Sequence, residues 1–182
     1  HWKRTLTTSN GRCTLASAKE ITAITNEYQK RIIEGDTTVV LPLVAYYGTG
    51  RLWLQHREKK EDVLLNSSRT NGYIDCMDSA ANDKLIMNWL NKETSKKLQK
   101  KTGTAAFDAV IMAIEKCISL LIESNDVTVS YNFDNNDLDI QYKKDDQEVI
   151  LPLNRMSDGY KCTISLITDI AYRMAQLNPQ LR

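Results

Sequence analysis

Apolar residues recur at steps of three and four in four stretches of the chain, which is the spacing of one face of an α-helix. The pattern predicts helices over residues 15–34, 79–100, 104–123 and 157–177. Thr14 can cap the first of these helices. Gly35 is suited to end it, because glycine readily adopts the left-handed conformation that follows many helices.

Alternation of apolar and polar residues predicts short strands in the last third of the chain. The strands are expected over residues 127–133, 138–143 and 148–153. The Asp-Asn-Asn-Asp stretch at 134–137 forms a tight turn between the first two strands, because these residues tolerate left-handed backbone conformations. The three strands therefore predict a half-buried β-meander.

The continuous apolar run Thr37–Tyr47 differs from these strands because its residues do not alternate. Such a run is typical of a strand buried on both faces, as in a parallel sheet. Pro42 has no N–H for a ladder, so the strand is expected to be irregular there or to lie at an edge. The order of elements, ending in a meander and a buried helix, predicts a mixed α/β (α+β) fold.

Composition narrows the class of protein. The 182 residues are enough for one domain, and a hydrophobic content of 42% with 26% charged residues is typical of a soluble globular protein. Twenty-four basic and 23 acidic side chains give a net charge of +1. The chain therefore lacks the overall basic excess typical of nucleic-acid-binding proteins, and only a local basic patch could bind nucleic acid. No apolar run approaches the roughly 20 residues of a membrane span, and no signal peptide is visible. We expect a cytoplasmic protein without membrane contact.

The four cysteines do not form a metal-binding pattern. Cys13, Cys76, Cys117 and Cys162 are widely spaced, without a CxxC pair and without a neighbouring histidine. Cys117 and Cys162 fall in apolar helical runs, where a free cysteine acts as a small hydrophobe. We therefore expect no metal site and a reduced, cytoplasmic setting.

The stretch Asn154–Pro179 places Ser-Asp-Gly-Tyr-Lys at the start of the last predicted helix. One interpretation is a capped helix, with Ser157 at the N-cap and Asp158 in the first turn. Its buried face would consist of Tyr160, Ile164, Ile167, Ala171 and Met174.

The other interpretation is an anion site at the same helix start. A helix amino end offers free N–H groups and the positive end of the helix dipole. Ser157 would add a hydroxyl donor, Gly159 would let the backbone approach a phosphate closely, and Lys161 would add charge. The residues by themselves leave both interpretations open.

Three further polar stretches have two interpretations each. The Lys-Lys-Leu-Gln-Lys-Lys end of the second helix, residues 96–101, is a solvated helix end or a phosphate-contacting patch. The Gly48-Thr49-Gly50-Arg51 stretch is a plain turn, or a nucleotide-proximal loop with Arg51 as a sensor. The cluster of Tyr73, Asp75 and Asp78 is a carboxylate pair or a helix-entry turn.

Met156-Ser157-Asp158-Gly159-Tyr160-Lys161 resembles the signature of ABC-type ATPases, Leu-Ser-Gly-Gly-Gln followed by a basic residue. Residues 2–18, 41–53 and 71–90 resemble the same bacterial group. That group is the SMC-like, ABC-type ATPases, often called AAA-family ATPases and found in anti-phage defence loci. The resemblance extends over essentially the whole chain.

In these ATPases the signature of one protomer closes over the γ-phosphate of ATP bound to the other. The resemblance implies that Ser157 and Gly159 donate to this phosphate, that Tyr160 stands for the Gln, and that Lys161 adds positive charge. Asp158 departs from the usual Gly. Its charge would repel a triphosphate unless it points away or pairs, for example with Arg155.

Neither nucleotide-binding motif is found in the chain. Gly48–Arg51 lacks the G-x-x-x-x-G-K-[ST] spacing of a Walker A loop, and an acidic Walker B strand is missing. The resemblance therefore implies a single domain, 1–182, that is an internal segment of a larger ATPase, between the two motifs. Residues 54–125 would form a helical lid-like insert beside a partial P-loop core, and residues 126–182 the meander and signature helix.

Two functions follow as hypotheses. In the first, the complete protein is a homodimeric ATPase that uses ATP and Mg²⁺ to control a nuclease or another effector. The segment alone would bind neither cofactor, and no catalytic residue is assigned within it. In the second, the chain is an interaction module without nucleotide chemistry, and the helices of residues 79–123 bind protein or nucleic acid.

Overall fold

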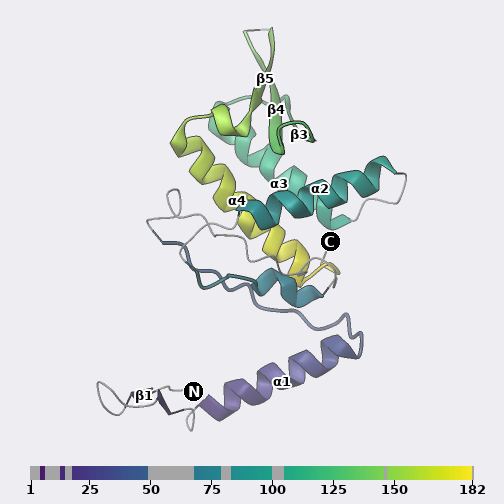
Figure 1. Ribbon diagram of the computed structural model, residues 1–182, viewed down its shortest axis with the longest axis vertical. Helices are drawn as coiled ribbons and strands as arrows, with labels where there is room; N and C mark the ends of the chain where they lie inside the picture. The colour runs from purple at the N-terminus through teal and green to yellow at the C-terminus, as the bar shows by residue number, and fades with distance from the viewer. Residues whose placement is uncertain are drawn as a thin grey trace. The chain divides into compact units, whose positions relative to one another are not determined.

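The computed structural model describes residues 18–48, 68–78, 83–99, 105–145 and 147–181, together with the backbone of 5–6 and 13–14. Two compact units are present, residues 1–41 and 42–182, and each is described by itself (Figure 1). The described elements are four α-helices, two short 3-10 helices (Arg69–Tyr73 and Leu153–Arg155), a three-stranded antiparallel sheet and a two-stranded ribbon, so the predicted mixture of α and β structure is confirmed. The predicted divisions at residues 54 and 126 stay predictions.

The first unit contains an antiparallel pair of two-residue strands, β1 (Thr5–Leu6) and β2 (Cys13–Thr14), and the helix α1 (Lys19–Ile33). The prediction that Thr14 caps this helix is wrong. Thr14 belongs to β2, and α1 begins after Ala18, whose side chain has no oxygen to accept a cap hydrogen bond.

The predicted end of α1 is confirmed. Gly35 has a φ of +80°, and its N–H donates to Ile32 O at 3.1 Å. The N–H of Asp36 donates to Arg31 O at 3.0 Å, which completes a Schellman motif. None of the residues of α1 is buried, and Ile24 in its apolar stripe is 51% exposed.

The predicted strand Thr37–Tyr47 is wrong. Residues 39–48 form no regular secondary structure. The Tyr46 N–H donates to Cys76 O at 2.6 Å, and Pro42 O accepts from the Tyr73 hydroxyl at 2.6 Å. Pro42 has no N–H to give to a ladder, and none of the described strands pairs with this segment.

The second unit contains the predicted meander, in the order β3-β4-β5 with antiparallel pairing. The strands are β3 (Val127–Asn132), β4 (Asp137–Lys144) and β5 (Gln147–Pro152). Each boundary lies within one residue of the prediction. The turns need left-handed residues as expected, with φ of 49° at Asn136 and 50° at Asp145.

Three helices complete this unit, namely α2 (Asp83–Leu98), α3 (Ala105–Ile122) and α4 (Asp158–Leu177). Figure 1 shows α3 and α4 side by side, with the sheet packed against α3. The Trp89 ring of α2 lies edge-on to Tyr172 of α4, with 5.2 Å between their centroids. These rings belong to one core with the inward residues of the sheet, which are Val129, Tyr131, Leu138 and Ile140.

The buried face of α4 differs from the predicted one. Tyr160 and Met174 are 37% and 53% exposed, and Ile167 and Ala171 are half-buried. The buried positions are Ile164, Thr168, Asp169, Tyr172, Arg173 and Leu177. The polar members of this set are hydrogen-bonded: the Thr168 hydroxyl donates to Ile164 O at 2.7 Å, and Arg173 donates to Asp169 and to two backbone carbonyls, as described below.

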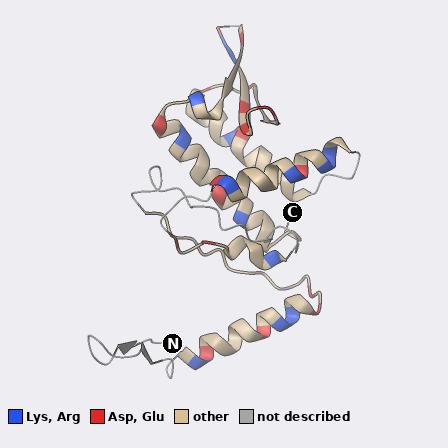
Figure 2. Cartoon of the chain, in the orientation of Figure 1, with Lys and Arg blue, Asp and Glu red and all other residues tan. Residues whose placement is uncertain are grey.

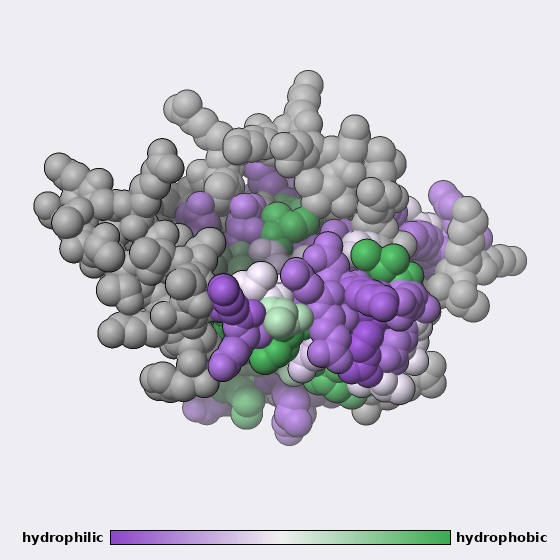
Figure 3. All heavy atoms as spheres, turned by 90° about the horizontal axis from the view of Figure 1, so that it is seen from below, coloured by the Kyte–Doolittle hydropathy of each residue, from purple (hydrophilic) through white to green (hydrophobic). Residues whose placement is uncertain are grey.

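The charge distribution is mixed. Figure 2 shows basic and acidic residues interspersed along α2 and α4. Among the residues that are coloured in Figure 3, hydrophilic side chains predominate and apolar side chains form small groups. Within the described ranges, no helix has the length and apolar character needed to cross a membrane.

Candidate functional site

The amino end of α4 is formed by Ser157, which precedes the first helical residue, Asp158. Ser157 has an extended backbone (φ −63°, ψ 155°), and its carbonyl accepts the first helical hydrogen bond from the Lys161 N–H at 3.0 Å. The N–H groups of Asp158, Gly159 and Tyr160 precede that bond, so the helix itself offers them no acceptor. Ser157 is therefore the N-cap residue, as predicted.

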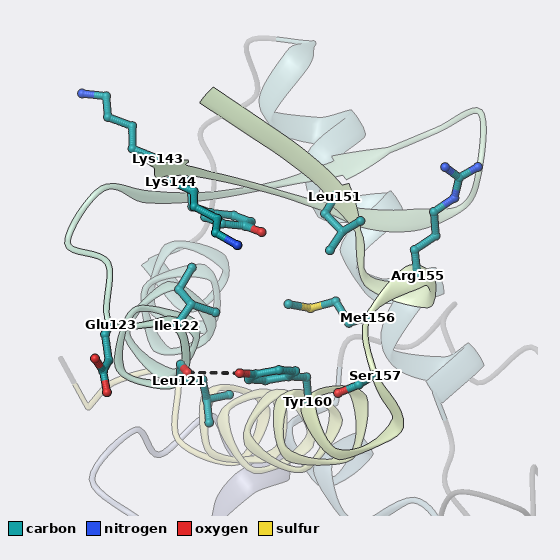
Figure 4. Close-up of a pocket in the computed structure, with 11 residues that line it drawn as sticks. Leu121, Ile122, Glu123, Lys143, Lys144, Leu151, Arg155, Met156, Ser157 and Tyr160 are labelled. Carbon is teal, nitrogen blue, oxygen red and sulfur yellow. Dashed lines mark hydrogen bonds between the residues drawn. The ribbon is translucent and has the colours of Figure 1, made fainter. Parts of the chain in front are cut away.

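The side chain of Ser157 does not act as predicted. It makes no cap hydrogen bond, although the extended backbone would allow one. Figure 4 shows its hydroxyl oxygen on the side of Tyr160, at the edge of a hollow beside the helix. The hydroxyl thus accepts no hydrogen bond from the first-turn amides, and residues 157–160 are all exposed.

Gly159 lies in open space. A β-carbon built at this position would meet no atom within 4 Å, apart from its own helix and chain neighbours. Packing within the described chain therefore does not require glycine here. A group approaching the helix start from outside would meet bare backbone at Gly159.

Asp158 pairs with Lys161 and not with Arg155, which corrects the predicted partner. Lys161 Nζ lies 2.8 Å from Asp158 Oδ1, one helical turn away. Lys161 is the nearer partner because residues three apart share one face of a helix. Asp158 is 67% exposed, so the pair stabilises the helix little, but it offsets the acid at the helix start.

Only one residue of the glycine-containing stretch 48–51 can be described. Gly48 ends the described segment, and Thr49, Gly50 and Arg51 lie outside the described residues. The proposed nucleotide-proximal role of this stretch therefore stays a prediction.

The cluster of Tyr73, Asp75 and Asp78 forms a turn. Asp75 has a φ of 51°, and its carbonyl accepts from the Asp78 N–H at 3.1 Å. The turn follows a short 3-10 helix, Arg69–Tyr73, whose start is capped by the Ser68 hydroxyl. Burial raises the pKa of Tyr73, whose hydroxyl donates to Pro42 O. These contacts favour the turn interpretation over a catalytic carboxylate pair.

The lysines described at the end of α2 have acidic partners. Lys96 pairs with Glu93, and Lys97 Nζ lies 3.0 Å from Asp108 Oδ1. Lys97 also lies over the Phe107 ring, 5.5 Å from its centroid. Lys100 and Lys101 lie outside the described residues. The contacts of Lys96 and Lys97 favour the interpretation as a solvated helix end over a phosphate patch.

Metal ligands do not gather anywhere in the part of the chain that the structure describes, where no group of three His, Cys, Asp or Glu could hold an ion. The described cysteines are Cys76, Cys117 and Cys162, and all three are half-buried thiols. Burial raises the pKa of Cys117, which keeps it in the thiol form.

A buried polar network on α4 was not predicted. Arg173 Nε donates to Asp169 Oδ2 at 2.9 Å, and the Tyr47 hydroxyl donates to the same oxygen at 2.8 Å. The Nη1 group of Arg173 donates to Gly72 O and Ile74 O, both at 2.9 Å. An acid followed four residues later by an arginine in an otherwise apolar helix is a signal that could have indicated it.

No protein-family model matches the chain, and no curated protein matches it. The resemblance of residues 156–161 to the ABC signature therefore rests on the residues themselves and on their place at the start of α4.

Proposed function

We propose that this chain is a segment of a dimerising, SMC-like ABC-type ATPase, and that the amino end of α4 contacts the γ-phosphate of ATP bound to a second subunit. The observation that carries the proposal is the open geometry of residues 157–160. Three features lie together at an exposed helix start: a serine hydroxyl that makes no cap hydrogen bond, three first-turn N–H groups, and a glycine with open space where a β-carbon would stand.

The electrostatics of a helix amino end favour the binding of an anion at the start of α4. The aligned peptide dipoles of a helix give its amino end a partial positive charge, and the free N–H groups point outward along the axis. The 20-residue helix is anchored by Ile164 and Tyr172, which are buried. A rigid helix can hold donors in place before a phosphate arrives, which is the main requirement for assisting phosphoryl transfer.

Each residue of the signature then has a role. The Ser157 hydroxyl and the Gly159 N–H donate to the γ-phosphate oxygens, and Tyr160 replaces the usual Gln. Lys161 keeps Asp158 paired, so that the acid repels the phosphate less. ATP and Mg²⁺ would be held mainly by Walker A and Walker B residues of the complete ATPase. Its closure with ATP would control an effector such as a nuclease.

The experiment compares two arginine variants of the complete protein. Ser157→Arg places a long side chain at the helix start, and Asn154→Arg places the same side chain at an exposed position just before it. We expect Ser157→Arg to abolish ATP-dependent dimerisation and ATP hydrolysis while ATP still binds, because binding uses the other motifs. Asn154→Arg should leave all three unchanged.

Sedimentation with and without ATP measures dimerisation, and phosphate release measures hydrolysis. Wild-type turnover in the Ser157→Arg variant would contradict the proposal. A complete protein that binds no ATP would contradict the proposed class of protein altogether.

A further inference from the structure

A pocket of about 550 Å³ lies beside the amino end of α4, in the second unit. Its walls come from the end of α3, the last residues of β4, the end of β5 and the start of α4 (Figure 4). The volume is within the range of small-molecule sites, which is roughly 300–1,000 Å³. The proposed ATPase function assigns no ligand to this pocket, although Ser157 and Tyr160 of the signature line it.

The pocket wall combines polar and apolar surface in about equal measure, and its apolar part can be followed in Figure 4. Leu151 and Met156 point into it from one side, and Ile122 faces them from α3 (Figure 4). The ring of Tyr160 lies across the bottom in the same view, and its hydroxyl donates to Leu121 O at 3.5 Å. A flat apolar group would therefore meet aliphatic side chains and one aromatic ring.

The charged side chains that line the pocket point in different directions. Figure 4 shows the ammonium group of Lys144 directed toward the interior, whereas Lys143, Arg155 and Glu123 point away from it. Lys143 is also paired with Asp126, at 3.1 Å. Among the charged side chains that line the pocket, Lys144 is thus the one that a bound ligand would meet.

We infer that this pocket binds a small amphipathic anion, with its flat apolar body among Ile122, Leu151, Met156 and Tyr160 and its anionic group on Lys144. Small-molecule sites commonly combine apolar side chains with a few directed polar groups, and this pocket offers both. The anionic group is a phosphate, as in a nucleoside monophosphate, or the carboxylate of an aromatic acid. This inference does not depend on the proposed ATPase function, although Met156, Ser157 and Tyr160 belong to both the signature and the pocket.

Fluorescence of 8-anilinonaphthalene-1-sulfonate tests the inference, because this probe has a flat apolar body and one anionic group. The 182-residue chain is titrated without ATP, so the result concerns the pocket alone. We expect saturable binding at one site. Lys144→Glu should weaken it about tenfold or more, the effect of losing one charge-assisted contact.

Lys143→Glu is the matched control, since it makes the same charge change one residue away on a side chain that points outward. It should leave the affinity for the probe within about twofold, because an exposed charge is screened by solvent. Leu151→Trp, which fills the pocket without changing charge, should abolish binding even if the lysine variant is ambiguous. Equal loss in both lysine variants, or full binding by Leu151→Trp, would overturn the inference.

Competition identifies the source of the anion. Displacement of the probe by adenosine monophosphate supports a nucleotide, and displacement by 2-naphthoate alone supports an aromatic carboxylate. Displacement by neither compound would contradict the inference, because the bound probe would then report another surface.

Discussion

Arg173 and Asp169 form an ion pair across one turn of α4, with Nε of the arginine 2.9 Å from Oδ2 of the acid. Their side chains are only 6% and 5% exposed. Arg173 also donates to the carbonyls of Gly72 and Ile74, and Asp169 also accepts from the Tyr47 hydroxyl. The pair therefore connects α4 to two segments that lie about a hundred residues earlier in the chain.

Replacing Arg173 by methionine should destabilise the second unit strongly. The substitution leaves a buried carboxylate without its cation and removes the donor of two carbonyls, which costs about 3–5 kcal/mol of unfolding free energy. Lys143→Met is the control, because it breaks a pair whose members are 62% and 66% exposed and should cost less than about 1 kcal/mol. Urea unfolding followed by circular dichroism measures both. Similar urea midpoints for the two variants would contradict a stabilising role of the buried Arg173–Asp169 pair.

Gly72 should tolerate no side chain. A β-carbon there would lie 2.6 Å from Cγ of Leu177, which is fully buried, and 3.1 Å from the Arg173 carbonyl oxygen. Gly72→Ala should therefore lower the free energy of unfolding by about 1–3 kcal/mol, the usual cost of overpacking. Thermal unfolding measures the loss, and an unchanged midpoint would show that the contact between the turn and α4 is looser than described.

Gly159→Ala should separate stability from activity. Alanine has space here and favours a helix, so the unfolding free energy should stay unchanged or rise by up to about 1 kcal/mol. Under the proposed function, ATP hydrolysis by the complete protein should nevertheless fall, because the methyl group would lie between the backbone and the phosphate. An alanine variant with full turnover would speak against close approach of a phosphate at this residue.

The carboxyl group of Asp36 should titrate at low pH. Hydrogen bonds from the Thr38 hydroxyl, the Thr38 N–H and Arg31 lower its pKa from 3.8 to about 2. Because the pKa of Asp36 is lower in the folded state, its carboxylate stabilises the folded state above pH 3.8. This stabilisation is lost as the pH falls through 2. In an NMR titration, Thr38→Val should shift the pKa upward, since it removes the hydroxyl donor at 2.7 Å. A pKa that does not change would exclude that hydrogen bond.

Tyr172 should remain a neutral phenol until strongly alkaline pH. Burial raises its pKa from 10.0 to about 12, because the phenolate would lose its solvation. Because the pKa of Tyr172 is higher in the folded state, the neutral phenol stabilises the folded state below pH 10. This stabilisation is lost as the pH rises through 12. The difference between the phenolate absorbance of the wild type and of Tyr172→Phe isolates this group among the eight tyrosines. Ionisation near pH 10 would indicate that the ring is open to water.

Local patterns predicted much of the fold. The meander is recognisable in the sequence because apolar and polar residues alternate along the strands and Asp and Asn residues lie between them, at the turns. The end of α1 is recognisable because glycine commonly ends helices, as Gly35 does. The run Thr37–Tyr47 was mistaken for a strand, because hydrophobicity alone does not supply a neighbouring strand to pair with. Pro42, which lacks a backbone N–H, was the signal against a strand that pairs along its whole length.

The candidate site was predictable only in part. The position of Ser157 as N-cap follows from the sequence, but the orientation of its hydroxyl depends on the side-chain conformation. The pairing of Asp169 with Arg173 was missed because their burial depends on carbonyls of residues 72 and 74, which are remote in sequence. Long-range contacts of this kind leave no periodic signal.

The central claim is that the amino end of α4 acts on ATP held by another subunit, and mixing two inactive proteins tests it most directly. One protein carries Ser157→Arg, and the other carries a substitution of the Walker A lysine that the resemblance expects outside this chain. A mixed dimer then contains one site with both halves intact. The account predicts that the mixture hydrolyses ATP although neither protein does so alone, and a mixture as inactive as its components would contradict it.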